Sequence, residues 1–494
     1  MLFQKMTEIA NTAPSTSGLR QDGVTHSYAD LVARVERLAA GFQSIGIGKG
    51  DRVVLFIPNS VDIWIVSHAL FAIGAITVPL NAQANPNELR STGERCAAKA
   101  IVARPEYLAV AERLNADLGG KLTVVQTGDN GSLSVADLEK HAPANLQPVA
   151  DDDDAVYLFS SGSTGRSKIV PWTHGALIRG GMHGAGLQQI QPDDVSLNGL
   201  PSYTSYGYIV GIGGDAFAGA TTMFWTDPQP IVMARGRMLA TIEREKITRL
   251  PGVPFLFDLL AGVTDNVDMS SVRMASSGGV AIKKPTFDRF YQRFGIPVRQ
   301  ALGLTEVGLV TFNMDPDPVS TWDSVGKPDP QVSVEIVPTP EAPTPDVGEI
   351  FVKTPGMTKG YMDVEPAVNA VFRNGGMMTG DLGRIGDNGH LYITGRIKFI
   401  VEVSGMKVDP IEVEDVLMAH PAVADAVVVG VPDPRTGEQR LKAVVVRKAD
   451  ETADNIIKFS RTRLTPHKVP VLLEFREQIP RNGAGKVLRS QLVD

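Results

Sequence analysis

The sequence predicts an α/β protein with a large N-terminal domain, residues 1–397, and a small α+β C-terminal domain, residues 398–494. Short apolar runs alternate with helical segments along the first part, which indicates mixed, largely parallel sheets covered by helices. The length of 494 residues is more than one core usually serves and suits two or three domains. Near Lys398 the pattern changes to two short strand-like runs followed by the start of a helix.

The elements of the first 150 residues follow in order. Strand-length apolar runs occur at 52–58, 75–80, 98–103 and 121–126. Ser27 is placed to cap a helix whose apolar face consists of Leu31, Val32, Val35, Leu38, Ala39 and Phe42. Polar and helix-breaking residues interrupt the apolar run Ile63–Leu80, so it favours a buried helix and a buried strand over a membrane span.

The last hundred residues begin with a helix-start signal. Asp409 is the expected cap, Pro410 takes the first helical position, and Glu412 would complete a capping box. The strand-like runs "DAVVVGV" and "KAVVVRK", the helix-like "NIIKFSRTRL" and the strand-like "LLEFRE" follow. These elements predict the compact α+β unit.

The composition is that of a soluble globular protein, with 43% apolar and 21% charged residues. The formal net charge of −7 argues against nucleic acid as the main partner. The single cysteine, Cys96, excludes an intramolecular disulfide and a cysteine-based metal cluster, and it fits a reducing compartment. The first residues lack the apolar stretch of a secretory signal, so a cytoplasmic location is expected.

The stretch "SSGSTGRSK", residues 160–168, is a candidate phosphate-binding loop. Glycines let consecutive N–H groups face one anion, hydroxyl groups add donors, and Lys168 adds a positive charge. The spacing differs from that of a P-loop, in which lysine directly follows the second glycine. Strand-like residues on both sides predict a loop between two strands. The alternative is a serine-rich surface turn.

Four further motifs carry chemistry. "QALGLTEVG" (300–308) holds a Thr-Glu pair that could bind Mg²⁺ or simply start a helix. "TGDLG" (379–383) places an aspartate in a glycine-flanked turn, where it could accept both hydroxyls of a ribose or be an ordinary turn residue. "GRIK" (395–398) lies at the domain boundary. "PRNGAGKVLRSQL" (480–492) presents a lysine on a glycine-rich turn, or else is a solvated basic tail.

The order and spacing of these five motifs resemble those of the adenylate-forming superfamily. This superfamily comprises acyl-CoA synthetases, the adenylation domains of peptide synthetases, and luciferases, and the resemblance covers essentially the whole chain. It implies that the large domain binds ATP and a carboxylic acid. It also implies that the small domain swings about a hinge between two half-reactions, adenylate formation and thioester formation.

The resemblance assigns roles to individual residues. Lys486, Thr164 and Glu306 match catalytic positions, Thr164 and Glu306 match the Mg²⁺-associated ones, and Lys398 falls at the hinge. Lys486 would bridge the substrate carboxylate and the α-phosphate. The positions that match ATP contacts are Ser160, Ser161, Gly162, Ser163, Thr164, Gly165, Lys168, Gly278, Gly279, Leu302, Gly303, Thr305, Asp381 and Arg396.

The acyl and CoA sites are also implied by the resemblance. The expected acyl pocket consists of His183, Thr204, Tyr206, Gly207 and Ala301, next to Gly278 and Leu302. The alternative for His183 is a structural histidine. The CoA candidates are Gly405, Arg435 and Arg440, and both arginines could instead be ordinary surface residues.

Several positions depart from the family pattern. Ser167 and Ile169 replace the usual proline and glycine around the loop lysine, without removing a phosphate contact. Leu302 stands where most members have the tyrosine that stacks on adenine, and Phe399 stands where aspartate is common. Thr204 replaces a histidine that lines the acid pocket in many members. The last change points to an unusual acid.

The acyl-CoA synthetase branch fits best. Residues 200–207 hold no carboxylate for a substrate ammonium group, which disfavours an amino acid. The glycines near Tyr206 leave room for a ring or a medium chain. The favoured expectation is an ATP-dependent acid–thiol ligase acting on an aromatic or cyclic acid, with ATP, Mg²⁺ and CoA. One alternative passes the acyl group to a carrier-protein phosphopantetheine or an amine, and another is a non-catalytic nucleotide-binding protein. Dimers are common in the family, so a homodimer is a further suggested partner.

Overall fold

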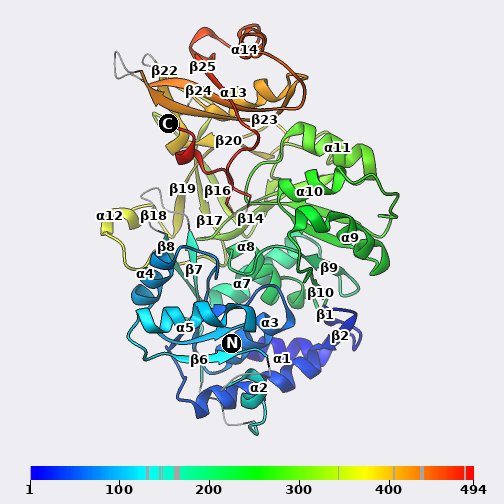
Figure 1. The fold of residues 1–494 in the computed structure, drawn as a ribbon, viewed down its shortest axis with the longest axis vertical. Coiled ribbons are helices and arrows are strands. Elements are labelled where there is room, and N and C mark those ends of the chain that lie inside the picture. Colours follow the sequence, from blue (N-terminus) through cyan, green and yellow to red (C-terminus); the bar gives the residue numbers. More distant parts are fainter. Residues whose placement is uncertain are drawn as a thin grey trace.

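The computed structural model describes residues 2–128, 133–143, 146, 148–160, 167–342, 344–403, 406–433, 439–482 and 485–493. In this part of the chain three sheets build the large N-terminal domain, and a smaller C-terminal domain sits above them (Figure 1). The predicted fold class is therefore confirmed.

The first sheet has six strands in the order β6-β5-β3-β4-β7-β8. Neighbouring strands are parallel from β6 to β7, and β8 is antiparallel to β7. Short apolar strands are separated by helices, as the sequence predicts. The strands are β3 (Arg52–Phe56), β4 (Ile76–Pro79), β5 (Ala98–Ala103), β6 (Thr123–Gln126), β7 (Asp154–Ser160) and β8 (Lys168–Thr173), and the helices near them are α4 (Pro86–Cys96), α5 (Leu108–Asp117) and α6 (Val135–Leu138).

Helices α2 (Tyr28–Ser44) and α3 (Val61–Ala72) form the core of this layer. The Ser27 side chain caps α2 by accepting a bond from the Asp30 N–H, and all six predicted face residues of α2 are buried. Helix α3 is apolar on every side because it is buried, and β4 follows it, so the run Ile63–Leu80 is core. In the described residues no helix combines the length and apolarity that crossing a membrane requires.

The second sheet has nine strands in the order β15-β14-β13-β12-β11-β9-β10-β1-β2. The pairs from β13 to β1 are parallel, and the outer pairs are antiparallel. Its strands are β1 (Gly18–Gln21), β2 (Val24–Ser27), β9 (Val195–Asn198), β10 (Thr221–Phe224), β11 (Arg249–Gly252), β12 (Met274–Ser277), β13 (Val298–Leu304), β14 (Gly308–Phe312) and β15 (Lys327–Pro328). The accompanying helices are α1 (Leu2–Thr12), α7 (His174–Leu187), α8 (Ser205–Ile209), α9 (Ile231–Arg244), α10 (Pro254–Ala261) and α11 (Lys284–Phe294).

The third sheet is antiparallel throughout, so the helix–strand alternation expected up to the change near Lys398 does not extend through it. Its strands are β16 (Ser333–Val337), β17 (Gly348–Lys353), β18 (Phe372–Arg373), β19 (Gly376–Ile385) and β20 (Leu391–Arg396), with the short helix α12 (Pro366–Asn369) before β18. Antiparallel neighbours need no crossover helix, and α12 is the one α-helix described between these strands.

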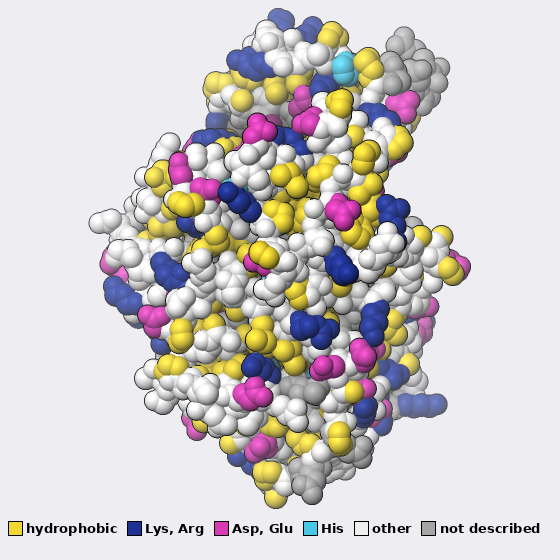
Figure 2. Space-filling model, turned by 180° about the vertical axis from the view of Figure 1, so that it is seen from behind, with side chains coloured by type: hydrophobic (Ala, Val, Ile, Leu, Met, Phe, Trp, Pro, Cys, Tyr) yellow, Lys and Arg dark blue, Asp and Glu magenta, His cyan; other side chains and the backbone are white. Residues whose placement is uncertain are grey.

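The C-terminal domain matches the predicted α+β unit. Its three-stranded sheet consists of β23 (Val423–Pro432), β24 (Gln439–Arg447) and β25 (Leu472–Phe475), and its other elements are β21 (Val401–Val403), β22 (Met406–Val408), α13 (Pro410–Met418) and α14 (Ala453–Arg461). It has its own apolar core. Figure 2 shows this domain as a narrow lobe on a broad body, with Lys and Arg interspersed among Asp and Glu on the visible face.

Asp409 caps α13 as predicted, since its carboxylate accepts the Ile411 N–H at 2.9 Å. The expected capping box is wrong, because the Glu412 carboxylate binds Lys468 at 2.6 Å instead. Asp409 also lies against β20, where a Cβ at Gly395 would collide with its carboxylate. Burial, reinforced by Glu414, raises the pKa of Asp409 from 3.8 to about 7, against the bond from Ile411.

We predict that Asp409→Asn stabilises the protein at pH 8 more than at pH 5. Because the pKa of Asp409 is raised in the folded state, its destabilising effect grows as pH rises from 3.8 through about 7. Asparagine caps a helix as well as aspartate and carries no charge. Thermal unfolding by calorimetry at both pH values measures this, with an expected difference of roughly 2 kcal/mol. The same change at both pH values would contradict the prediction.

Candidate active site

A cavity of about 1830 Å³ lies between the large domain and the C-terminal domain, with walls from both. Its wall brings together most of the described residues that the sequence singled out. These are Ser160, Lys168, Thr204, Tyr206, Gly278, Gly279, Ala301, Leu302, Gly303, Thr305, Glu306, Asp381, Arg396, Lys398 and Lys486.

Other predicted site residues are elsewhere. Ser161, Gly162, Ser163, Thr164, Gly165, Gly405 and Arg435 lie outside the described residues. Three described ones, His183, Gly207 and Arg440, do not line the cavity. Arg440 on β24 pairs with Asp433 at 3.4 Å. Gly207 is held close to the backbone of Pro201, where a Cβ would overlap the carbonyl oxygen.

The β7–β8 hairpin carries both described ends of the candidate phosphate loop. Ser160 and Lys168 are direct partners in its antiparallel register, so the intervening segment joins two strands as predicted. The Lys168 ammonium lies 4.4 Å from the centre of the Tyr361 ring. A cation over an aromatic face is stabilised by the ring quadrupole. The lysine is thus held at the cavity wall by a neutral side chain.

Thr305 and Glu306 occupy the turn between β13 and β14, so the alternative of a helix start is wrong. The Thr305 carbonyl accepts the Trp172 indole N–H at 2.8 Å, which ties this turn to β8. Glu306 is 6% exposed, and its Oε1 accepts the Tyr361 hydroxyl at 2.9 Å. No cation pairs with Glu306 among the described residues. A buried carboxylate with a neutral partner fits a site for a divalent cation.

Tyr361 is a site residue that the sequence reasoning missed. Its hydroxyl holds Glu306 and its ring lies under Lys168, so it connects the phosphate loop with the candidate metal carboxylate. Burial, followed by the charge of Glu306, raises its pKa, which keeps the phenol protonated and donating. No sequence motif contains Tyr361, so its distance from other residues in the chain gives no signal that it belongs to the site.

Asp381 lies within strand β19, which corrects the expectation of a turn. It is the cross-strand partner of Arg396 on β20. The Arg396 Nε donates to the Asp381 carboxylate, and its second terminal nitrogen lies 3.5 Å from Oδ2. Asp381 is 7% exposed. The pairing orients a carboxylate and a guanidinium together at the cavity wall.

Lys486 lies on a tight turn of the C-terminal domain. Its N–H donates to Asn482 Oδ1 at 2.9 Å, and its carbonyl accepts the Asn482 N–H at 2.8 Å. Burial, then the neighbouring charges of Arg396 and Lys398, lower the pKa of Lys486 to about 8, against the opposing charges of Asp381 and Glu306. Three cationic groups therefore converge on one part of the cavity, which favours an anionic ligand there.

The part of the cavity that holds the candidate acyl pocket, called the acyl end below, begins at α8. Thr204 caps this helix by accepting the Gly207 N–H at 3.1 Å, and its own hydroxyl donates to Pro201 at 2.8 Å. The Thr204 hydroxyl, at the position where many family members have a histidine, is therefore engaged in hydrogen bonds to its own chain. Gly278 lies beside the Tyr206 ring, since a Cβ at Gly278 would lie 3.4 Å from it, and both residues line the cavity.

Helix α7 presents a glycine face to the same end. Gly180, Gly181 and Gly184 line the cavity. His183, on the same helix, does not line the cavity; its Nδ1 lies 4.0 Å from Asp329 and its Nε2 is buried. This position fits the alternative of a structural histidine. A Cβ at Gly184 would meet only Leu309, at 3.7 Å, so this position leaves free space.

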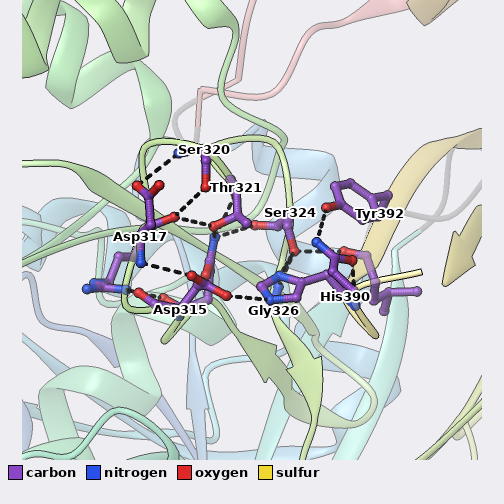
Figure 3. Close-up of polar contacts among 12 residues, drawn as sticks. Asp315, Asp317, Ser320, Thr321, Ser324, Gly326, His390 and Tyr392 are labelled. Carbon is purple, nitrogen blue, oxygen red and sulfur yellow. Dashed lines mark hydrogen bonds and ion pairs between the residues drawn. The ribbon is translucent and has the colours of Figure 1, made fainter. Parts of the chain in front are cut away.

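A buried polar cluster braces the wall from behind (Figure 3). His390 contacts Asp315 at 2.9 Å through Nε2 and Ser324 at 2.7 Å through Nδ1. The cluster fixes the segment that places Trp322 and Val325 in the wall. The three residues resemble a serine–histidine–aspartate set, but Ser324 is fully buried and none of the three lines the cavity. Their role is structural.

Two family patterns match the chain. The pattern of the AMP-binding enzyme family covers residues 6–362, and that of the AMP-binding enzyme C-terminal domain covers residues 412–486. The chain belongs to the AMP-binding enzyme family. Feruloyl-CoA synthase from an Amycolatopsis species is 31% identical to it over 98% of this chain and 96% of that protein. The putative acyl–CoA ligase YdaB of Bacillus subtilis is 31% identical over 95% and 94% of the two chains.

The fold comparison agrees with the sequence comparison. ATP-bound MatB from Rhodopseudomonas palustris superposes with a TM-score of 0.89 at 28% identity, over 100% of this chain and 98% of that one. The expected branch is confirmed: the protein is an AMP-forming acyl-CoA synthetase. It uses ATP to activate a carboxylic acid as the adenylate and passes the acyl group to CoA. The alternative of a non-catalytic nucleotide-binding protein is wrong.

We predict that Tyr361→Phe lowers acid-dependent pyrophosphate–ATP exchange by roughly tenfold, because a buried carboxylate loses its hydrogen-bond donor. The ring under Lys168 remains. Tyr157→Phe is the matched control, since its hydroxyl contacts the Asp154 carboxylate at 3.1 Å and it does not line the cavity. Equal exchange rates in the two variants would show that the Tyr361 hydroxyl does not support Glu306.

Proposed function

We propose that the acid is an aromatic or other cyclic carboxylic acid without a charged ring substituent. The observation that carries this is the lining of the acyl end. From α7, α8 and the π-helix Val210–Gly214, the lining residues are Leu177, Gly180, Gly181, Gly184, Ala185, Ser205, Tyr206, Ile209, Val210 and Gly214, and none is charged. An aromatic side chain over glycine-made space suits a flat, apolar group.

Asp215, the acidic residue that directly follows the π-helix, is not available to a substrate amine. It is 3% exposed, accepts the hydroxyls of Ser196 at 2.7 Å and Thr222 at 3.0 Å, and does not line the cavity. A buried ammonium at the acyl end would have no counterion there. Relatives named for ring-containing acids, feruloyl-CoA synthase and 2,3-dihydroxybenzoate-AMP ligase, support the same class.

Adenylation joins two anions, and the cationic end of the cavity suits that requirement. Lys486 would neutralise charge between the acid carboxylate and the α-phosphate as it develops in the transition state. Asp381 would accept the ribose hydroxyls, with Arg396 beside it. Ser160 and Lys168 would hold the outer phosphates. Positioning and electrostatics suffice, and no protein nucleophile is required.

Glu306, together with Thr164, would hold Mg²⁺. The divalent ion, when bound, supplies charge neutralisation and Lewis-acid polarisation of the phosphate oxygens. Tyr361 orients the Glu306 carboxylate toward the cavity without neutralising it, so its acceptor capacity is kept for the ion.

The domain boundary and hinge are placed at Lys398, with residues 1–397 as the adenylation domain and residues 398–494 as the lid. Lys398 lies in the 3₁₀ turn Ile397–Phe399, directly after β20 and Arg396. Lys486 must enter for adenylate formation and leave before the thiol attacks, so a hinge is a requirement of the chemistry. Arg440 faces away from the cavity in this arrangement, and rotation of the lid would be needed to bring it to CoA.

A carrier-protein phosphopantetheine or an amine as a further acceptor stays a prediction, as do the homodimer and a cytoplasmic location. Free CoA consumption with AMP release distinguishes the acceptors. Adenylate formation without CoA turnover would favour the carrier protein or the amine.

We predict that Lys486→Ala lowers pyrophosphate–ATP exchange by about a hundredfold or more. Thioester formation from supplied acyl-AMP and CoA should remain, because the lysine has left the site in that step. The two half-reactions are measured separately on one preparation. Equal loss in both would contradict the role of Lys486.

A panel of carboxylic acids in the exchange assay tests the acid class. We expect bulky cyclic acids to give the highest kcat/KM, and Gly184→Leu to reduce it for them by roughly tenfold or more relative to a short acid such as butanoate. Gly186→Leu is the matched control, because Gly186 lies on α7 with open space around it and outside the cavity. A preference for short or charged acids in the unaltered enzyme would overturn the proposal.

A further inference from the structure

A chain of contacts joins the large domain to the turn that carries Lys486. Lys283 is the cap residue of α11 in the large domain, and its ammonium donates to the Ala426 carbonyl at 3.0 Å and lies 3.4 Å from Asp425 Oδ1. Asp425 and Ala426 belong to β23 of the small domain. The contact therefore crosses the cavity between the domains.

The same aspartate holds the lysine turn. Arg481 donates to Asp425 Oδ2 at 2.6 Å and to the Gly485 carbonyl at 3.1 Å. That carbonyl belongs to the peptide unit that leads into Lys486. Asp425 thus accepts from Lys283 on one oxygen and from Arg481 on the other, and Arg481 fixes the backbone next to Lys486.

The turn also lies close to the large domain. Gly485 has φ +77°, and a Cβ there would lie 3.7 Å from Val253 and 3.9 Å from Phe255. The ionic contact, which reaches the turn through Asp425 and Arg481, is therefore the polar connection between this turn and the large domain. The two side chains of this ionic contact are each only 26% exposed.

Lys283 lies near two carboxylates of the small domain, those of Asp425 and Asp415. Burial raises the pKa of Asp415 on α13 to about 6, and Lys283 is the charge that opposes this rise. The other strong contact of Asp425, to Arg481, lies within the small domain and moves with it. Rotation of the lid therefore breaks the Lys283 contact and keeps the Arg481 contact.

We propose that Lys283 is a positioning residue for the adenylation half-reaction, which acts through Asp425 and Arg481 to hold the Lys486 turn in the cavity. This inference rests on the role proposed above for Lys486. An interaction present in only one of two domain arrangements stabilises that arrangement by its own free energy. Lys283 therefore favours adenylate formation and is released for thioester formation.

The test compares Lys283→Glu, Lys283→Arg and Lys284→Ala in the full-length enzyme. Lys284 is the matched control because it neighbours Lys283 but pairs with Asp288 in its own helix. Charge reversal places a carboxylate against Asp425, so we expect Lys283→Glu to lower pyrophosphate–ATP exchange by roughly tenfold. Lys283→Arg keeps the charge and should retain exchange within about threefold.

Thioester formation from supplied acyl-AMP and CoA is the second measurement. We expect it to be unchanged or faster in Lys283→Glu, because the released lid reaches its second arrangement more easily; this result also shows that the variant is folded. Equal loss in both half-reactions, or exchange like that of Lys284→Ala, would overturn the proposal. A double variant, Lys283→Ala with Arg481→Ala, should lose no more exchange than Arg481→Ala alone, and additive losses would equally overturn it.

Lys486→Ala measured in parallel separates the two proposals. If it spares thioester formation while Lys283→Glu behaves like Lys284→Ala, only the role of Lys283 is wrong. If Lys486→Ala impairs both half-reactions equally, the role of Lys486 is wrong and the inference about Lys283 falls with it.

Discussion

The proposed function depends on the constraint that one of its cations, Lys486, is carried by the C-terminal domain. Lys486 reaches the cavity on a turn that Asn482 and Lys486 close by reciprocal bonds, and Gly485 of this turn lies close to Val253 and Phe255 of the large domain. The other candidate nucleotide contacts that line the cavity, among them Lys168, Glu306 and Asp381, belong to the large domain. In the proposed function, the large domain binds the ligands and the orientation of the C-terminal domain sets which half-reaction proceeds.

The convergence of positive charge is the feature of this cavity that favours an anionic ligand. Burial, and then the charges of Arg396 and Lys398, lower the pKa of Lys486 to about 8, so part of that shift is the cost of bringing like charges together. An anionic ligand removes that cost. Tyr361 contributes differently, since it supports Lys168 through its ring and Glu306 through its hydroxyl without adding charge.

Much of this architecture follows from local sequence patterns. The apolar strand runs, the Ser27 and Asp409 caps, and the hairpin around residues 160–168 appear as predicted because each rests on neighbours in sequence. The two glycines that flank Asp381 predict a turn, but both lie within strand β19, where Gly380 adopts φ +72°. Glu412 pairs with Lys468 instead of completing the capping box, and His183 lies near Asp329. Both contacts are between residues far apart in the sequence, so only the tertiary structure determines them. The site residues were proposed from motif order, whereas Tyr361 and Lys283 belong to no recognised spacing and depend on distant partners.

Strand β20 joins two functions that are usually considered separately. It carries Arg396 beside Asp381, it runs directly into the turn at Lys398, and its Gly395 is the surface on which the Asp409 carboxylate rests. In the proposed function, nucleotide occupancy and the orientation of the C-terminal domain therefore act on one short stretch of backbone. By thermodynamic linkage, whichever lid orientation binds the nucleotide more tightly is the one that the nucleotide populates, and the strength of the two effects is equal.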